Sequence, residues 1–349
     1  MAHEYKAVQW NRFKRRYDAV LSVGIAGYLS AFVVATNFAF APGQSMTMIQ
    51  VLMRAFGSCA FGLLTLILLI GPLARLSPRF LPLLYNRRHL GVACFFLALV
   101  HAVLALIWYQ GFSDVNPFVA LLTSNPRYTS IDGFPFEILG AVALAILFVM
   151  AATSHDFWNT NLGPRFWKTL HMGVYFAYAL LVAHLALGVI QYEKSLLYVV
   201  IIGAAAVLVP ALHVVTGGRE RKRDLSPDAR SNDGWITVGP ARDIPDCRAR
   251  IVVPPRGERI AVFRDGSKIF AVSNVCRHQG GPLGEGRIVD GCITCPWHGF
   301  QYRPESGTSP PPFTDKIATY RTRIVDGAVH VYEKAMPPGT TVAPSIIAP

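Results

Sequence analysis

Cys276-Arg277-His278 and Cys295-Pro296-Trp297-His298 are the two motifs that decide how the last third of this chain folds. Sixteen residues separate them, and glycine follows each one closely. Two thiolates and two imidazoles from a pair of loops indicate a metal centre. Tetrahedral zinc uses the same four ligands, although zinc sites seldom place Cys and His with a single residue between them.

Short alternating stretches surround these motifs and are separated by Gly, Pro and Asp turns. A period of two predicts β-strands. We expect strands over residues 235–238, 250–253, 259–263, 269–274, 317–324 and 328–332. Residues 233–334 are therefore predicted to form a small all-β domain.

Residues 234–333 resemble the Rieske [2Fe-2S] domain, on the two motifs and on the glycines that follow them. The resemblance implies a cluster in which Cys276 and Cys295 hold one iron, while His278 and His298 hold the other. Replacing two thiolates by neutral imidazoles raises the potential of such a centre above that of all-Cys clusters.

The chain departs from high-potential Rieske proteins, which have an extra disulfide-bonded Cys in each loop. Gly281 and Trp297 occupy those two places, and Phe300 stands where those proteins have a Ser that donates to a sulfide. Tyr302 is kept and can donate to a cysteine sulfur. Because fewer donors stabilise the reduced cluster less, we predict a potential in the lower part of the Rieske range.

The chain before about Gly218 is mostly apolar. Of all 349 residues 52% are hydrophobic and 15% are charged, against about 25% charged in soluble domains. A single soluble globule is therefore excluded. A helix needs about 20 apolar residues to cross the hydrocarbon core. We predict six spans, the fourth of them short, at residues 19–41, 49–74, 90–109, 138–152, 169–191 and 195–217.

The predicted fold class is multidomain, an all-α six-helix transmembrane bundle followed by a small all-β Rieske domain. The expected segments are a basic N-terminus at 1–16, the membrane domain at 17–218, a basic and polar linker at 219–232, the Rieske domain at 233–334 and a Pro-rich tail at 335–349.

The formal charge of +12 would by itself suggest nucleic-acid binding. The basic residues cluster beside the apolar runs, however, so we expect a membrane-surface role and no nucleic acid. Fifteen Lys and Arg flank one side of the spans, and only Arg54, Arg127 and Lys194 flank the other. Because cytoplasmic loops carry the excess, we expect a multi-pass protein of the bacterial inner membrane with both termini and the Rieske domain in the cytoplasm.

Ionisable residues inside spans are functional candidates. His101 lies in the third span, His171 and His184 in the fifth, and His213 in the sixth, with His89 at the mouth of the third. Each could simply donate to a neighbouring helix. For the first three together we favour axial ligation of haem iron, which requires neutral imidazoles on facing helices.

Thirteen residues separate His171 from His184, a rise of about 19.5 Å and a turn that leaves the side chains about 140° apart. Two levels in the membrane are therefore predicted, with either a bulge in the helix or haems on different faces. We pair His101 with His184 at the outer level. His171 would serve the inner level, where the second ligand is open and His89 is better placed than His213.

Arg54 lies inside the outer end of the second span. It could snorkel to the interface or meet a haem propionate.

The stretches Asn86-Arg87-Arg88-His89-Leu90-Gly91 and Phe166-Trp167-Lys168-Thr169-Leu170-His171 lead to His101 and His184 respectively. With them, residues 17–215 resemble the ferric reductase-like transmembrane family, most of all its haem-binding subunit of the periplasmic methionine sulfoxide reductase system. The resemblance implies one or two b-type haems in the bundle. Oxidase members continue into flavin and nicotinamide domains, and nothing in this chain resembles those.

The two halves together predict a membrane electron-transfer protein with no catalytic residues for a substrate of its own. We expect a cytoplasmic donor, a flavin reductase or a ferredoxin-like protein, and a periplasmic acceptor or quinone. The alternatives are a quinol-oxidising Rieske and cytochrome b module, or a redox or iron sensor in which electrons go no further.

Overall fold

The structure is a computed structural model with two compact units. One unit contains Leu73–Arg87 and Val214–Pro349, and the other contains Trp10–Pro72 and Arg88–His213. The structure describes residues 12–39, 46–84, 86–111, 114–155, 158, 162, 164–193, 196–226, 228, 233–278, 280–297, 299–311 and 313–348.

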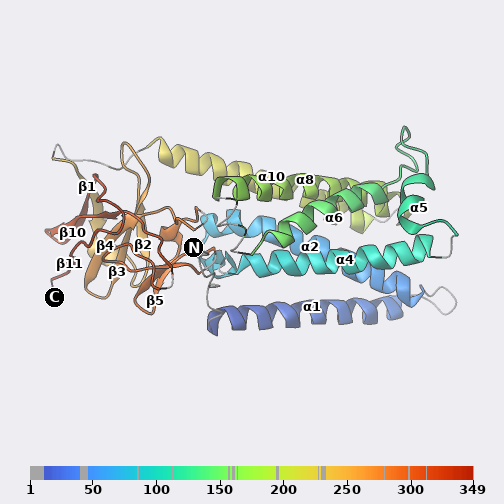
Figure 1. The fold of residues 1–349 in the computed structure, drawn as a ribbon, viewed down its shortest axis with the longest axis horizontal. Helices are drawn as coiled ribbons and strands as arrows, with labels where there is room; N and C mark the ends of the chain where they lie inside the picture. Colours follow the sequence, from blue (N-terminus) through green and yellow to red (C-terminus); the bar gives the residue numbers. More distant parts are fainter. Residues whose placement is uncertain are drawn as a thin grey trace, which may run out of the picture. The chain divides into compact units, whose positions relative to one another are not determined.

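Long apolar helices make up most of the first 224 residues (Figure 1). The long ones are α1 Arg12–Ala39, α2 Met48–Leu76, α4 Arg87–Gln110, α6 Glu137–Ala152, α8 Pro164–Leu187 and α10 Leu196–Asp224. The short ones are η1 Pro78–Phe80, α3 Leu81–Leu84, α5 Pro117–Thr123 and α9 Val189–Glu193.

Five of the helical segments in the described part of the chain are long and apolar enough to cross a membrane. They are Lys14–Thr36, Met48–Leu76, Arg87–Gln110, Phe166–Gln191 and Leu196–Asp224. The fourth expected span, at residues 138–152, forms α6, whose 16 residues rise only about 24 Å. After α6 ends at Ala152, the hydroxyls of Thr153 and Ser154 donate to the carbonyls of Val149 and Met150.

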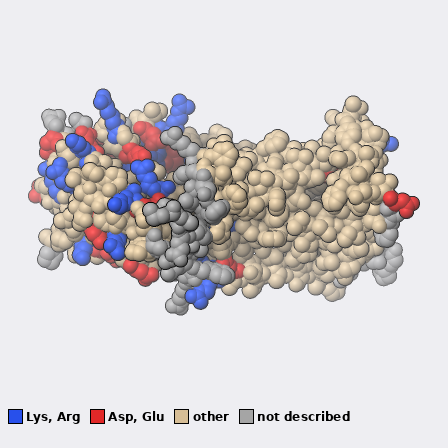
Figure 2. Space-filling view, viewed as in Figure 1, with Lys and Arg blue, Asp and Glu red and all other residues tan. Residues whose placement is uncertain are grey.

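In the unit formed by Trp10–Pro72 and Arg88–His213, side-chain contacts join the long helices. Tyr28 of α1 donates to Ser58 of α2, and the ring of Tyr178 on α8 stacks on Phe61 of α2 at 5.6 Å. On the face seen in Figure 2, the helical surface carries almost no charged side chains between its ends. An apolar exterior of this kind suits a hydrocarbon environment.

The β domain contains three small antiparallel sheets. Their orders are β1-β10-β9, β11-β4-β3-β2 with β8 beside β4, and β5-β6-β7. The bounds are β1 Trp235–Pro240, β2 Ala249–Val252, β3 Ile260–Asp265, β4 Lys268–Ser273, β5 Arg287–Val289, β6 Cys292–Thr294, β7 Gln301–Tyr302, β8 Thr319–Tyr320, β9 Thr322–Val325, β10 Ala328–Tyr332 and β11 Ser345–Ile346. Short 3-10 turns lie at η2 Ala241–Asp243 and η3 Leu283–Glu285.

Three features of this domain differ from the sequence prediction. The expected Pro-rich tail contains the strand β11, which pairs with β4. The single strand expected over 317–324 is divided at Arg321, so that β8 pairs with β4 while β9 pairs with β10. The sheet β5-β6-β7 was not predicted, because its strands have only two or three residues. A strand that short shows no readable alternation.

The last turns of α10 are bound to the β domain within the same unit. Arg259 donates to Glu220, and its Nε donates to Asp224 at 2.7 Å. Asp228 and Val253 exchange two hydrogen bonds of 2.8 and 2.9 Å. The end of the helix is therefore joined to the domain by charged and backbone contacts.

Candidate redox centres

The two Cys/His loops of the β domain fold into the same turn. The Cys276 N–H donates to the Gly281 carbonyl, five residues on, and the Cys295 N–H donates to Phe300 in the same way. In return Gly280 and Gly299 each donate to the carbonyl of the Cys four residues before. Both of these glycines have φ of +72°, a backbone conformation that favours glycine.

The turns bring the motif cysteines together in the core of the domain. Cys276 and Cys295 are each 1% exposed, and His278 is 9% exposed. Their thiols lie within hydrogen-bonding reach of each other. His298, predicted as the fourth ligand, lies outside the residues that the structure describes.

Gly281 makes this approach possible. A Cβ at that position would lie 2.8 Å from the Cys295 sulfur and 3.1 Å from the Trp297 ring. Gly281 and Trp297 are the positions at which high-potential Rieske proteins have their disulfide. A contact between a glycine and an aromatic ring therefore occupies that place.

Tyr302 lies beside the Cys276 sulfur, at an O···S distance of 3.5 Å. Its oxygen accepts the Arg277 N–H at 3.0 Å, so the phenolic hydrogen is available to the sulfur. Burial and the neighbouring Cys276 raise the pKa of Tyr302, which keeps it a donor. Burial alone would raise the pKa of Cys276, but hydrogen bonds from Cys295 and Tyr302 lower it to about 7.

Phe300 covers one face of the His278 imidazole. The two rings are stacked, with centroids 4.8 Å apart and planes 7° apart. Phe300 also packs on Phe313 at 4.9 Å. An aromatic side chain therefore occupies the position at which high-potential Rieske proteins have a hydroxyl donor.

In the helical unit, His101 and His184 face each other. Their ring centroids are 6.4 Å apart. His101 Nδ1 lies 2.8 Å from the Met53 carbonyl, and His184 Nδ1 lies 2.8 Å from the Phe136 carbonyl. Because a carbonyl only accepts, each Nδ1 carries the proton and each Nε2 is the basic nitrogen.

Two glycines make room for these rings. A Cβ on Gly57 of α2 would lie 2.6 Å from His101 Nδ1, and one on Gly140 of α6 would lie 3.0 Å from His184 Nδ1. A metal-bound imidazole nitrogen lies about 2.0 Å from the metal. Rings with centroids 6.4 Å apart therefore leave room for one metal atom between them, and the pair fits bis-histidine ligation of haem iron.

His171 lies nearer the N-terminal end of α8 than His184 does, and its imidazole is bound to its own helix. Its Nδ1 is 3.0 Å from the Trp167 carbonyl, and the Trp167 indole stacks on its ring at 3.7 Å. The Trp167 N–H in turn donates to the Thr153 carbonyl. Because α8 is α-helical throughout Pro164–Leu187, His171 and His184 lie on different faces rather than across a bulge.

The other predicted residues are dispersed. His89 Nδ1 lies 2.8 Å from the Asp18 carboxylate of α1. His213 Nδ1 lies 2.9 Å from the Val209 carbonyl of its own helix. Arg54 is half-buried on α2 and directly follows Met53, so its backbone is level with the carbonyl that holds His101.

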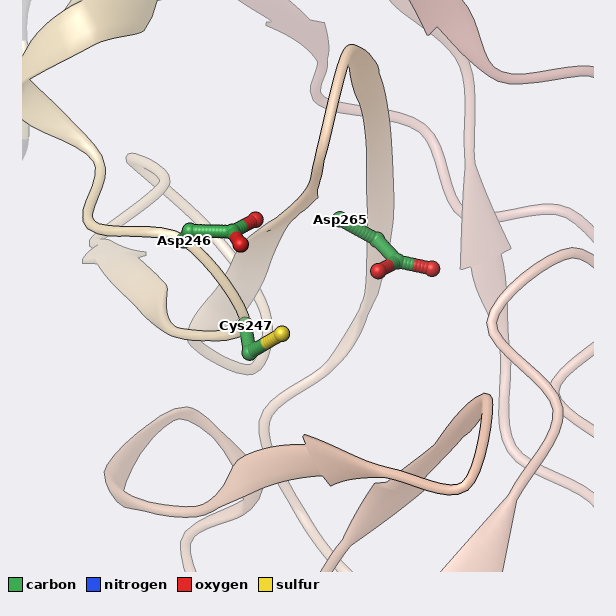
Figure 3. A group of neighbouring side chains, drawn as sticks. All are labelled: Asp246, Cys247 and Asp265. Carbon is green, nitrogen blue, oxygen red and sulfur yellow. The ribbon is translucent and has the colours of Figure 1, made fainter.

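A separate group of potential ligands lies in the β domain (Figure 3). Asp246 and Cys247 come from one loop and Asp265 from the end of β3, with ligand atoms within 4.8 Å of one another. The Gly266 N–H donates to Asp246 at 2.7 Å and lowers the pKa of that carboxyl. We therefore assign Asp246 to holding the β3–β4 turn.

Comparison with known proteins gives separate matches for the helical part and for the β domain. Residues 56–182 match the model of the ferric reductase-like transmembrane component, and residues 234–321 match the Rieske [2Fe-2S] domain. The protein-methionine-sulfoxide reductase heme-binding subunit MsrQ of Brucella ovis is 30% identical over 181 residues, which are 51% of this chain and 76% of that protein. The chain belongs to the ferric reductase-like transmembrane family.

The C-terminal part of this ferric reductase-like protein has relatives of its own. The anthranilate 1,2-dioxygenase ferredoxin subunit of Burkholderia cepacia is 43% identical over 75 residues, 21% of this chain and 68% of that protein. A ferredoxin solved in complex with the oxygenase of carbazole 1,9a-dioxygenase is 26% identical, covers 30% of this chain and 99% of its own, and has a TM-score of 0.29.

The two family models, the MsrQ relative and the apolar helices indicate a multi-pass membrane protein with a Rieske domain, and that domain implies a [2Fe-2S] cluster. The two families together support an electron-transfer role.

Several residues that shape these centres were missed in the sequence. Gly57 and Gly140 are isolated glycines inside apolar helices, which is the one signal that could have found them. The carbonyls of Met53 and Phe136 leave no trace in the sequence. The stacked rings of Trp167 and Phe300 likewise become visible only in three dimensions.

Proposed function

We propose that this protein transfers electrons between the Rieske cluster and b-type haem across the membrane, outward to a periplasmic acceptor or quinone. One observation carries the proposal: a single chain contains a buried Cys276/Cys295 pair and, in its membrane unit, two imidazoles spaced for one metal atom. The iron-sulfur cluster and the haem supply one-electron chemistry when they are bound.

The chain's own residues would serve these groups in different ways. Cys276, His278, Cys295 and His298 would hold the cluster, and Tyr302 would donate to the Cys276 sulfur. His101 and His184 would hold one haem, with Nδ1–H donation to backbone carbonyls keeping each ring neutral and oriented. Arg54, level with the Met53 carbonyl, would meet a propionate of that haem.

The membrane arrangement is part of the proposal. With six spans, counting α6, both termini and the Rieske domain would lie on the cytoplasmic side of a bacterial inner membrane, as the excess of basic residues on one side predicts. The segments are then 1–16, 17–218, 219–232, 233–334 and 335–349. His171 lies about 19.5 Å from His184 along α8, which provides a second haem level nearer the cytoplasm, with His89 or His213 as its other ligand.

The donor would be a cytoplasmic flavin reductase or a ferredoxin-like protein. In the oxidase members flavin and nicotinamide domains follow the helical bundle, and in this chain a Rieske domain follows it. The MsrQ relative is named as the heme-binding subunit of a protein-methionine-sulfoxide reductase. A separate periplasmic methionine sulfoxide reductase is therefore the first acceptor to test.

Stopped-flow spectroscopy of the purified, reconstituted protein tests the function. The cluster is reduced by a flavin reductase with NADH, and the haem α band is followed. We expect haem reduction to follow cluster reduction and to be lost in Cys276→Ser protein. Haem that never accepts electrons from the cluster would contradict the proposal and favour a sensor. Cluster and haem reduction by a quinol alone would favour the quinol-oxidising module.

A further inference from the structure

The face of α8 that carries His171 is distinct from the face that carries His184. His171 and Tyr175 are four residues apart, so their side chains lie on the same face of the helix, one above the other. His184 lies about 140° away around the same helix. Since α4 supplies His101 to the His184 side, the His171 side of α8 must be served by a different helix.

That helix is α10. The His213 ring meets the Tyr175 ring edge-on, with centroids 5.2 Å apart and planes 86° apart. Tyr175 is one helical turn, about 6 Å, from His171 along α8. His213 therefore lies against the His171 face of α8 and within about one turn of its level.

His213 also has the tautomer that ligation requires. Its Nδ1 donates to Val209, four residues before it, and His171 Nδ1 donates in the same way to Trp167. In both residues the proton is on Nδ1, so that Nε2 is the basic nitrogen. The Nε2 of His171 is buried, as a ligand inside the bundle would be.

His89 does not share this geometry. It is carried by α4, which lies on the His184 side of α8, and it is turned about 120° from His101 around that helix. Its Nδ1 is bound to Asp18 of α1 at 2.8 Å. The ring is thus held toward α1.

From these contacts we propose that His213 of α10 is the second axial ligand of a haem held by His171. This inference rests on the proposed function, because it assumes a haem at the inner level. It assigns the sixth span to the haem-binding machinery and makes the inner site an α8/α10 site, distinct from the α4/α8 site of His101 and His184.

Haem content and the EPR spectrum of low-spin ferric haem test the assignment on the full-length protein. His213→Ala and His171→Ala should each lower haem per protein by about half, and their double variant should lose no more than either one. His101→Ala combined with His213→Ala should lose nearly all haem. His89→Ala is the matched control and should keep both haem content and spectrum.

Two further variants separate ligation from structural support. His213→Gly should regain the missing low-spin signal when imidazole is added, since free imidazole can occupy the position of the side chain. His213→Met should raise the midpoint potential of that haem, because a Met/His pair has a higher potential than a His pair. The haem of His101 and His184 serves in each case as an internal measure of folding.

Full haem and an unchanged spectrum in His213→Ala would overturn the assignment, as would loss of the same haem in His89→Ala. A wild-type protein whose single haem survives in His171→Ala would overturn the inner site as a whole. That last result leaves the stopped-flow test of electron transfer intact, since the haem of His101 and His184 would still be present.

Discussion

At the scale of single residues, one hydrogen bond sets much of the environment of the cluster sulfurs. Tyr302 accepts from the Arg277 N–H and directs its own hydrogen to Cys276. Such a donor stabilises the reduced, more negative state. The stacked Phe300 beside His278 contributes no donor of this kind.

Tyr302→Phe is therefore expected to lower the midpoint potential of the cluster. A hydrogen bond worth about 1 kcal/mol corresponds to roughly 40 mV in a one-electron couple. EPR-monitored redox titration measures the shift. Tyr320→Phe is the control, because Tyr320 is also buried but packs in the other core of the domain; an equal shift there would contradict the role of Tyr302.

The absolute potential is a second prediction at this scale. With Phe300 in place of a hydroxyl and no disulfide between the loops, the cluster is expected in the lower part of the Rieske range, which extends from about −150 to +300 mV. The same titration on wild-type protein gives the value. A midpoint near the upper limit would mean that donors other than Tyr302 reach the sulfurs.

At the scale of elements, close packing of one helix on another positions the imidazoles. Gly57 of α2 touches His101 of α4, and Gly140 of α6 touches His184 of α8. Met53 and Phe136, which accept from these rings, are each 48 residues away in sequence. The proposed haem site is thus defined by pairs of helices and not by any one of them.

Gly57→Ala is expected to displace His101, because the new Cβ would lie 2.6 Å from its Nδ1. Overlap of this size forces side-chain shifts that typically cost about 1–3 kcal/mol, so haem occupancy at this site should fall. The absorbance of the α band per protein measures it. Gly62→Ala on the same helix meets nothing within 4 Å and should retain full haem. Equal losses in both would indicate a general weakness of α2.

At the scale of the whole molecule, charged and backbone contacts join the last turns of α10 to the β domain within one compact unit. Arg259 of the segment before β3 donates to both Glu220 and Asp224 in the last turns of α10. Asp228 then joins Val253 through its backbone and side chain. The connection between the end of α10 and the β domain therefore depends partly on ion pairs.

Arg259→Ala should loosen that connection. Partly exposed pairs contribute only about 0.2–1 kcal/mol each, so we expect proteolytic cleavage between Asp224 and Asp233 to become a few-fold faster. High salt should reduce the difference, because it screens the pairs in wild-type protein. Arg264→Ala, which removes bonds made inside the domain, is the control. Identical cleavage rates in wild-type and Arg259→Ala protein would show that these pairs do not hold the domain.

The ferric reductase-like part and the Rieske part of the chain were predictable, because the resemblance of each depends on local patterns. A run of about 20 apolar residues is long enough to span a membrane wherever it occurs, and C-x-H with C-x-x-H places its donors in two tight loops. The short length of α6 was also predictable, because the apolar run at residues 138–152 is itself short.

The partners of the membrane histidines could only be decided by tertiary structure. Spacing along α8 placed His171 and His184 at two levels, but it left open whether the helix carries a bulge and which residue pairs with His171. Which imidazole faces which depends on how α4, α8 and α10 are rotated about their axes. That rotation is set by close packing of Gly57, Gly140 and Tyr175 against rings on other helices, and no single segment of sequence contains it.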